Sequence, residues 1–257
     1  MRIRLLPSSA GRESQLQCLT SFLIDDSIVI DGGSIGFALP PGEFGIVHNI
    51  IVTHGHADHT ASLPIYVAEA FSLLEEPIII FGSDEVISTL RQHVFNDHVW
   101  PNFEKIELNN GSGPTIEYRE LHARRTINIR GIDVTPIPVN HLVPTFGLLL
   151  RNNTVAVAFT SDTYTTDEIW KTAREIDELK AVFVDVSFPN EFGELAAASK
   201  HLTPELLLGE LSKLERNVDV FAVHIKPTNR DKVIEEIAAL PGAPVSIGEI
   251  DRVYEWE

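Results

Sequence analysis

The fold is decided by the stretch Thr53-His54-Gly55-His56-Ala57-Asp58-His59-Thr60, in which three histidines and one aspartate lie within six residues. Before it, residues 49–52 form an apolar run that predicts a buried strand. After it, residues 61–71 have the periodicity of a helix. We therefore expect the stretch to form a loop between a strand and a helix.

The side chains of this stretch are those of a metal site. Imidazole nitrogens and a carboxylate, without a thiolate, favour Zn²⁺ or another first-row metal such as Mn²⁺ or Fe over Ca²⁺ and Mg²⁺. Their spacing allows His54 and His56 to bind one ion while Asp58 and His59 face a second.

Length and composition predict a globular protein with a sizeable core, because 44% of the 257 residues are hydrophobic. No break in composition divides the chain, so we expect a single domain over residues 1–257. Residues 1–7 contain too short an apolar run for a signal peptide, and no apolar run reaches the length of a membrane span. These features predict a cytoplasmic protein that does not bind membranes.

Cys18 is the only cysteine, which excludes intramolecular disulfides and thiolate-rich metal sites.

The charge balance restricts the class of partner. Twenty basic and 37 acidic residues give a net charge of −17, which disfavours nucleic-acid polymers and anionic membranes. A small anion remains compatible, since two divalent cations would make the pocket itself locally positive.

A predicted hairpin supplies a further polar residue near the histidine-rich stretch. Residues 19–24 and 28–31 predict two strands that turn at Asp25-Asp26, and the second strand ends in Asp31-Gly32-Gly33. Glycines at a strand end permit close approach of another backbone. Asp31 is a candidate acceptor for the N–H of a metal-bound imidazole, with an ordinary turn-forming aspartate as the alternative.

Later strands also end in polar residues, at the place where α/β scaffolds hold their site residues. The strand over 134–139 leads to His141, the strand over 155–159 leads to Asp162, and the strand over 218–223 leads to His224. The second half of the chain alternates between further strands and helices: we expect helices near 166–178, 203–215 and 230–240, a strand over 181–186 and a last strand over 245–247. Ser83 should cap a helix that carries His93 on its apolar face, and His98 and Trp100 follow that helix as residues of undecided role.

The order His54-x-His56-x-Asp58-His59, then His141, Asp162 and His224, resembles the ligand series of the metallo-β-lactamase superfamily. The resemblance implies an α/β fold, a four-layer αββα sandwich with two metals at one edge. It also implies the ligand sets: His54, His56 and His141 for the first metal, Asp58, His59 and His224 for the second, and Asp162 as the bridge between them.

Three further groups of residues are similar to the class II 3',5'-cyclic-nucleotide phosphodiesterases: residues 19–34, residues 93–101, and residues 185–190 with 201–204 and 224–227. The similarity implies a dimetal hydrolase that opens cyclic nucleotides such as cyclic AMP to 5'-monophosphates, with a small anionic phosphodiester as its partner. The chain departs from that class at Ala57, where leucine is usual, and at Lys200, where glycine is usual.

His201-Leu202-Thr203 resembles the His-x-Thr element of the phosphodiester-cleaving branch, which includes ribonuclease Z. Ribonuclease Z pairs that histidine with a glutamate four residues before its bridging aspartate, and this position is Ala158 here. We expect Asp58 to orient the nucleophile and His201 to protonate the leaving oxygen or stabilise the phosphoryl oxygens. Candidate substrate contacts are Ser161, Thr163, Asn190 and His201, with Trp100 and Phe188 as candidate stacking surfaces. Ser187 is a further pocket-lining candidate. Ordinary turn roles fit Ser161, Thr163, Ser187 and Asn190 equally well.

Other functions remain open at this point, because one fold hosts many activities. The alternatives are another hydrolase of this fold, acting on RNA ends or on a thioester or lactone, and a non-hydrolytic di-iron protein that binds oxygen. The oligomeric state is also open, with a homodimer among the options.

Overall fold

The computed structural model describes residues 1–8, 14–242 and 245–257, and its strands form two seven-stranded mixed sheets. Each sheet belongs to one of two compact units. The first unit comprises residues 1–15, 19–122 and 250–255, and the second comprises residues 16–18, 123–249 and 256–257. Each unit has helices and an apolar core of its own. The single domain expected from composition stays a prediction.

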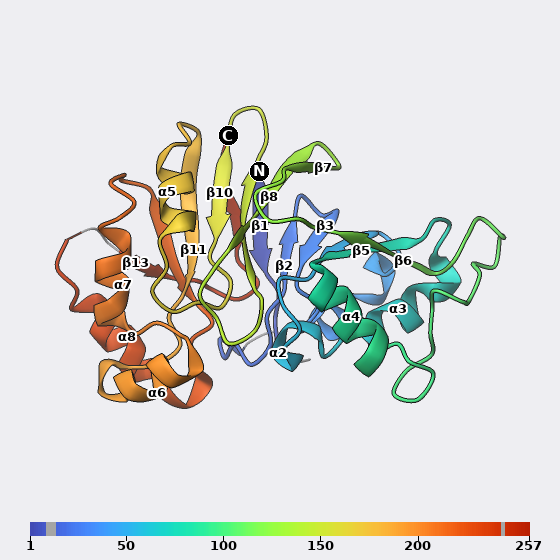
Figure 1. Ribbon diagram of the computed structural model, residues 1–257, viewed down its shortest axis with the longest axis horizontal. Coiled ribbons are helices and arrows are strands. Elements are labelled where there is room, and N and C mark those ends of the chain that lie inside the picture. Colours follow the sequence, from blue (N-terminus) through green and yellow to red (C-terminus); the bar gives the residue numbers. More distant parts are fainter. Residues whose placement is uncertain (9–13, 243–244) are drawn as a thin grey trace. The chain divides into compact units, whose positions relative to one another are not determined.

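The sheet of the first unit has the strand order β14-β1-β2-β3-β4-β5-β6 (Figure 1). Its pairs are antiparallel from β14 to β3 and parallel from β3 to β6. The parallel strands β3 and β4 are buried throughout, as expected for strands covered on both faces. The strands are β1 (Arg2–Leu5), β2 (Phe22–Ile24), β3 (Ile28–Ile30), β4 (Asn49–Ile51), β5 (Ile78–Gly82), β6 (Ile116–Glu120) and β14 (Val253–Glu255).

The helices of the first unit begin at local signals in the sequence. As predicted, Ser83 caps α4 by accepting the Val86 N–H at 3.3 Å. Pro64 lies in the first turn of α3, where its missing N–H removes no helical hydrogen bond. Both helices lie beside β5 and β6 in Figure 1 and contribute Tyr66 and Leu90 to the core. The helical segments are α1 (Ile35–Ala38), η1 (Pro41–Glu43), α2 (Ala57–Thr60), α3 (Leu63–Ala70), η2 (Phe71–Leu73) and α4 (Asp84–His93).

The sheet of the second unit has the order β13-β12-β11-β10-β9-β8-β7. Here the strands from β10 to β13 are parallel, and those from β7 to β10 are antiparallel. The β7–β8 hairpin turns at Arg130-Gly131, both with positive φ, as a two-residue turn requires. The strands are β7 (Ile127–Ile129), β8 (Ile132–Pro138), β9 (Phe146–Arg151), β10 (Ala156–Phe159), β11 (Leu179–Asp185), β12 (Asp219–Val223) and β13 (Val245–Ile247).

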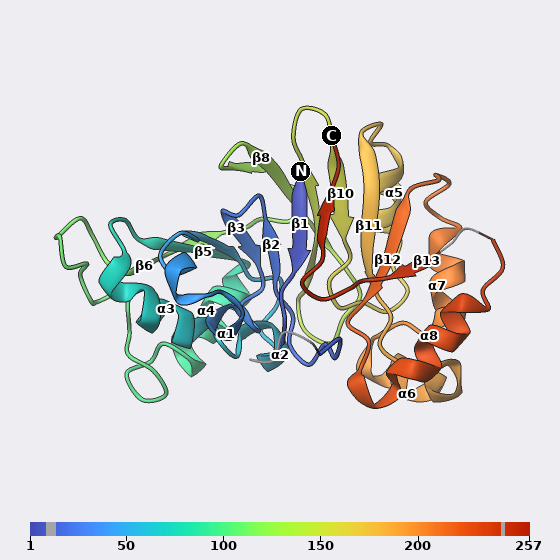
Figure 2. The ribbon, with the colours of Figure 1, turned by 180° about the vertical axis from the view of Figure 1, so that it is seen from behind.

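The helices of the second unit pack on this sheet around Trp170, which is fully buried. The indole Nε1–H of Trp170 donates to the carboxylate of Glu210 on α7 at 2.7 Å, so two helices are joined inside the core. Figure 2 shows α7 and α8 beside β12 and β13. The helical segments are α5 (Glu168–Arg174), η3 (Asn190–Phe192), α6 (Gly193–Ser199), α7 (Pro204–Leu211), η4 (Pro227–Asn229) and α8 (Arg230–Ala238). None of the helices in the described ranges is long and apolar enough to cross a membrane.

Most predicted elements are confirmed, including the hairpin turned at Asp25-Asp26, whose φ angles are +43° and +52°. Two predictions about strands and loops are wrong. Residues 245–247 form β13 as predicted, but the last strand is β14, which pairs with β1. The local sequence pattern does not reveal this pairing, because the two strands lie far apart in the sequence. Asp58 and His59 lie in the short helix α2 and not in a loop. The expected place of His93 on an apolar face is also wrong: it is exposed in the last turn of α4.

Candidate metal and catalytic site

Many of the predicted site residues follow the carboxyl ends of strands, whereas His201 follows helix α6. Several follow the parallel half of a sheet, which is where open α/β sheets bind ligands. Three of the residues that leave these strands have left-handed backbone conformations: Asp31 after β3 (φ +62°), Ser161 after β10 (φ +53°) and His224 after β12 (φ +60°). Such conformations are uncommon outside glycine, and these three occur at positions that lead into the candidate site.

The Gly32-Gly33 pair brings the backbone of the first unit close to α2. A Cβ on Gly33 would lie 2.1 Å from the Asp58 carbonyl oxygen and 2.7 Å from that of Thr20. The Thr20 N–H donates to the same Asp58 carbonyl at 2.8 Å, and the Gly32 N–H donates to the His59 carbonyl at 2.7 Å. The close approach predicted for these glycines is therefore confirmed, and it fixes the backbone that carries Asp58 and His59.

Asp31 orients two histidines of the first unit. His59 donates its Nδ1–H to Asp31 Oδ2 at 2.7 Å. The Thr53 hydroxyl lies 3.0 Å from each Asp31 oxygen and 3.1 Å from His54 Nδ1. Since a carboxylate can only accept, the hydroxyl donates to Asp31 and accepts from His54 Nδ1–H. In both neutral rings the lone pair is therefore on Nε2, the nitrogen left for a metal. The acceptor role predicted for Asp31 is confirmed.

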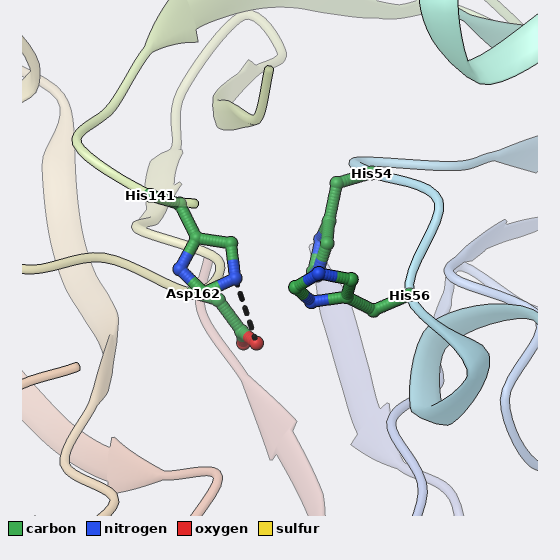
Figure 3. A group of neighbouring side chains, drawn as sticks. All are labelled: His54, His56, His141 and Asp162. Atoms are coloured by element: carbon green, nitrogen blue, oxygen red, sulfur yellow. Dashed lines mark ion pairs between the residues drawn. The ribbon is translucent and has the colours of Figure 1, made fainter. Parts of the chain in front are cut away.

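The remaining candidates of the first unit lie beside these rings. The rings of His54 and His56 have centroids 4.7 Å apart, and those of His54 and His59 are 4.1 Å apart. Figure 3 shows His54 and His56 on the segment that follows β4. His54 and His59 are buried, whereas His56 and Asp58 are half-buried. One small region of the first unit thus presents three imidazoles and a carboxylate.

In the second unit, the two oxygens of Asp162 face two different histidines. His141 Nε2 lies 3.8 Å from Oδ2, drawn as a dashed line in Figure 3, and His224 Nε2 lies 3.5 Å from Oδ1. Two donors 2.1 Å from one tetrahedral zinc ion are about 3.4 Å apart. The two separations are therefore close to those of donors that share an ion, and the oxygen and nitrogen donors fit a divalent metal.

His141 is held by the backbone of a neighbouring helix end. Its Nδ1–H donates to the Lys200 carbonyl at 3.0 Å, which again leaves the lone pair on Nε2. Lys200 ends α6 in a left-handed conformation (φ +59°). This conformation explains why glycine suits that position in the class that the chain resembles.

Asp185, at the end of β11, has the same role in the second unit as Asp31 has in the first. His201 donates Nδ1–H to Asp185 Oδ2 at 2.8 Å, and the Thr163 N–H donates to the same oxygen at 3.1 Å. The Ser187 hydroxyl donates to Oδ1 at 2.7 Å and lies 3.0 Å from His224 Nδ1, from which it accepts. One histidine is thus held directly and another through a hydroxyl.

The charge of Asp185 is stabilised by these donors. Burial by itself would raise the pKa of the Asp185 carboxyl, but the neighbouring charge of His201 and the hydrogen bonds from His201 and His224 hold that pKa at about 2. Asp185 is therefore a carboxylate at neutral pH. Its Oδ2 accepts the Nδ1–H of His201, as a buried aspartate does for the histidine of a catalytic triad.

His201 lies among the proposed ligands of the second unit. Its ring stacks on His224 at 5.4 Å and 16°, and contacts His141 at 5.1 Å. Asp162, Asp185, His201 and His224 each offer an atom within 4.8 Å of the others. Because Asp185 is occupied by three donors, this group combines two candidate metal ligands, Asp162 and His224, with an Asp–His pair.

The predicted substrate contacts have varied surroundings. Ser161 is half-buried, and the Thr163 hydroxyl is buried and donates to the Tyr164 carbonyl. Asn190 is exposed, and its Oδ1 accepts the Glu205 N–H in the first turn of α7. Trp100 is half-buried against the core of the first unit. Phe188 is half-buried beside His201, with ring centroids 5.9 Å apart.

The orienting roles of three residues were not predicted from the sequence: Thr53, Asp185 and Ser187, of which Ser187 was only a pocket-lining candidate. Asp185 carried a usable signal, because it ends an apolar strand as Asp31 does. The two hydroxyls carried none, since serine and threonine are common in turns and their partners lie far away in sequence.

Comparisons with known proteins identify the family. A family model of class II cAMP phosphodiesterases matches residues 44–234. The chain belongs to this family. A probable 3',5'-cyclic-nucleotide phosphodiesterase of Yersinia pestis is 27% identical over 208 residues, which cover 71% of this chain and 58% of that protein. This class II family member thus spans little more than half the length of that relative.

Solved structures confirm the fold. Unliganded yeast PDE1 has a TM-score of 0.77 at 17% identity, covering 98% of both chains. A metallo-β-lactamase fold protein, YhfI from Bacillus subtilis, has a TM-score of 0.74 at 13% identity, also covering 98% of both chains. The predicted α/β fold of metallo-β-lactamase type is confirmed for this class II phosphodiesterase family member.

We expect the Asp162→Ala variant to lose at least one metal ion per chain and nearly all turnover, because its two oxygens face two different histidines. The measurement is metal content by mass spectrometry after removal of loosely bound ions. Asp177→Ala, which removes an aspartate whose side chain is 93% exposed, is the matched control and should keep its metals. Wild-type metal content in Asp162→Ala would show that the carboxylate is not a ligand.

Proposed function

We propose that this protein is a metal-dependent phosphodiesterase that opens 3',5'-cyclic nucleotides, such as cyclic AMP, to 5'-monophosphates. The observation that carries the proposal is the family match over residues 44–234. That range contains all seven predicted metal ligands together with His201 and Asp185. The family match also favours this activity over the thioester, lactone and di-iron alternatives.

The proposed ligands are those that the family resemblance implies for two divalent ions. His54, His56 and His141 would hold the first, Asp58, His59 and His224 the second, and Asp162 would bridge them. The hydrogen-bond partners at Nδ1 support this assignment, because they leave the lone pair on Nε2. This holds for four of the proposed ligands: His54, His59, His141 and His224. The nitrogen and oxygen donors favour Zn²⁺, with Mn²⁺ or Fe as alternatives. When bound, such ions supply an activated water and neutralise charge on the phosphoryl group.

The protein's own groups complete the reaction. The Asp58 carboxylate would accept a hydrogen bond from the attacking water and direct its lone pair toward phosphorus. Attack breaks the bond between phosphorus and O3', and the electrons of that bond pass to O3'. Protonated His201 would give the proton on Nε2 to this leaving oxygen, while Asp185 holds the ring through Nδ1. The attacking water keeps one proton on the new P–O bond and loses the other to solvent, from which His201 is reprotonated. The product is a 5'-monophosphate with a free 3'-hydroxyl.

A small substrate fits this chain better than RNA. The net charge of −17 opposes a polyanion, and Ala158 replaces the glutamate of ribonuclease Z. Phe188 beside His201 offers a ring on which a base can stack, and Trp100 is a second candidate. Ser161, Thr163 and Asn190 stay candidate substrate contacts, and the homodimer and the cytoplasmic location stay predictions.

Competition between cyclic AMP and a tRNA precursor at moderate salt tests the substrate. We expect 5'-AMP to form with Zn²⁺ or Mn²⁺ while the RNA stays intact, because a chain this acidic releases few counterions on binding a polyanion. The products are scored by chromatography and gel. Faster RNA processing, or no opening of cyclic AMP with any divalent metal, would contradict the proposal.

The His201→Ala variant tests the general acid. We expect cyclic AMP hydrolysis to slow by about 10² or more, as is typical when an acid–base group is lost, with metal content unchanged. The defect should shrink for bis(p-nitrophenyl) phosphate, whose leaving group needs no proton. His122→Ala removes a half-exposed histidine and serves as the control. Equal defects on both substrates would remove His201 from this role.

A further inference from the structure

Lys226 contacts the nitrogen of His224 that the site needs for a metal. Its Nζ lies 3.4 Å from His224 Nε2. Because His224 Nδ1–H donates to Ser187, the lone pair of the neutral ring is on Nε2, where the Lys226 ammonium donates to it. The same Nε2 lies 3.5 Å from Asp162 Oδ1. The ammonium is therefore beside the place where two proposed ligands face each other.

The backbone of Lys226 is held in place. Its N–H donates to the Ser187 carbonyl at 3.2 Å, and its carbonyl accepts the Asn229 N–H at 3.0 Å. Ile225 before it is buried, and Pro227 after it opens η4. These contacts hold the backbone of Lys226 two residues from His224, and its side chain is half-buried.

This placement has a physical consequence for metal binding. One lone pair cannot serve both an ammonium and a metal ion, so an ion on Nε2 must displace Nζ. The displaced ammonium then lies a few ångströms from a divalent cation, and the two repel. An anion that contacts both charges removes this conflict. A phosphoryl oxygen is such an anion, and lysine is a common phosphate-binding residue.

We propose that Lys226 is a phosphate-binding residue of this site, with its ammonium on a non-bridging oxygen of the phosphodiester substrate and of the phosphomonoester product. The inference rests on the proposed function and extends it by naming the group that recognises the phosphate. Negative charge on the phosphoryl oxygens grows as water attacks the monoanionic diester. An ammonium at this position therefore stabilises the transition state more than the substrate.

The proposal predicts two effects of opposite sign. Removal of the ammonium takes away a competitor for His224 Nε2 and a charge that repels the metal, so metal should bind more tightly. It also removes a charge-assisted hydrogen bond to phosphate, so phosphate should bind more weakly. A residue that only supports the fold would weaken both.

The test compares Lys226→Met and Lys226→Gln with Lys226→Arg and with Lys180→Met. Lys180 is exposed near the start of β11, so Lys180→Met makes the same charge change at the other end of the strand from Asp185. Zn²⁺ affinity is measured on metal-free protein by competition with a chelator. Inorganic phosphate affinity is measured on zinc-loaded protein by calorimetry, and thermal unfolding reports on the folded state. Neither binding measurement requires hydrolysis of cyclic AMP.

We expect Lys226→Met and Lys226→Gln to bind Zn²⁺ about threefold more tightly, as for the loss of a partly screened like charge. Phosphate affinity should fall about tenfold or more, as for the loss of a hydrogen bond to a charged group. Lys226→Arg should keep phosphate affinity within about threefold, and Lys180→Met should change neither affinity.

Unchanged phosphate affinity in the two neutral variants would overturn the proposal, and so would a parallel loss of zinc and phosphate affinity. The neutral variants could bind zinc more tightly and phosphate more weakly while the parent protein fails to open cyclic AMP. That result would support the role of Lys226 and contradict the cyclic-nucleotide function. The two failures are therefore distinguishable.

Discussion

In each unit, one buried aspartate holds two imidazoles. The candidate site depends on these two aspartates. Asp31 accepts from His59 directly and from His54 through the Thr53 hydroxyl. Asp185 accepts from His201 directly and from His224 through the Ser187 hydroxyl. A neutral imidazole has one N–H and one lone pair, so a partner that takes the N–H also decides where the lone pair points. Two carboxylates thereby orient three of the proposed metal ligands and the proposed proton donor.

The sheets explain how such carboxylates can be buried. Both aspartates come at the ends of parallel strands, β3 and β11, where backbone N–H groups and hydroxyls converge. A buried carboxylate is costly unless several donors satisfy it. Asp31 accepts hydrogen bonds from the Thr53 N–H, the Thr53 hydroxyl and His59. Asp185 accepts them from the Thr163 N–H, the Ser187 hydroxyl and His201. The hydrogen bonds that orient the ligands are thus the same ones that make these buried charges tolerable.

The sequence predicted the parts of the site that depend on residue type and local pattern. Histidines and aspartates at the ends of apolar strands were recognisable, and Asp31 was a candidate acceptor because it preceded two glycines. Asp185 was missed as an orienting group because its partners, His201 and His224, follow it by 16 and 39 positions and converge only in the folded unit. β14 was missed for a similar reason, since three residues near one end of the sequence gain their strand character from pairing with β1.

The central claim is that these aspartates fix the histidine tautomers before any ligand binds. The most direct measurement is nitrogen NMR of the imidazoles in metal-free protein near neutral pH, with His54 and His59 assigned by substitution. The account predicts a protonated Nδ1 and an unprotonated Nε2 in both rings, and loss of this preference at His54 alone in the Thr53→Val variant, with recovery in Thr53→Ser. A protonated Nε2 in the parent protein, or an unchanged His54 in Thr53→Val, would contradict it.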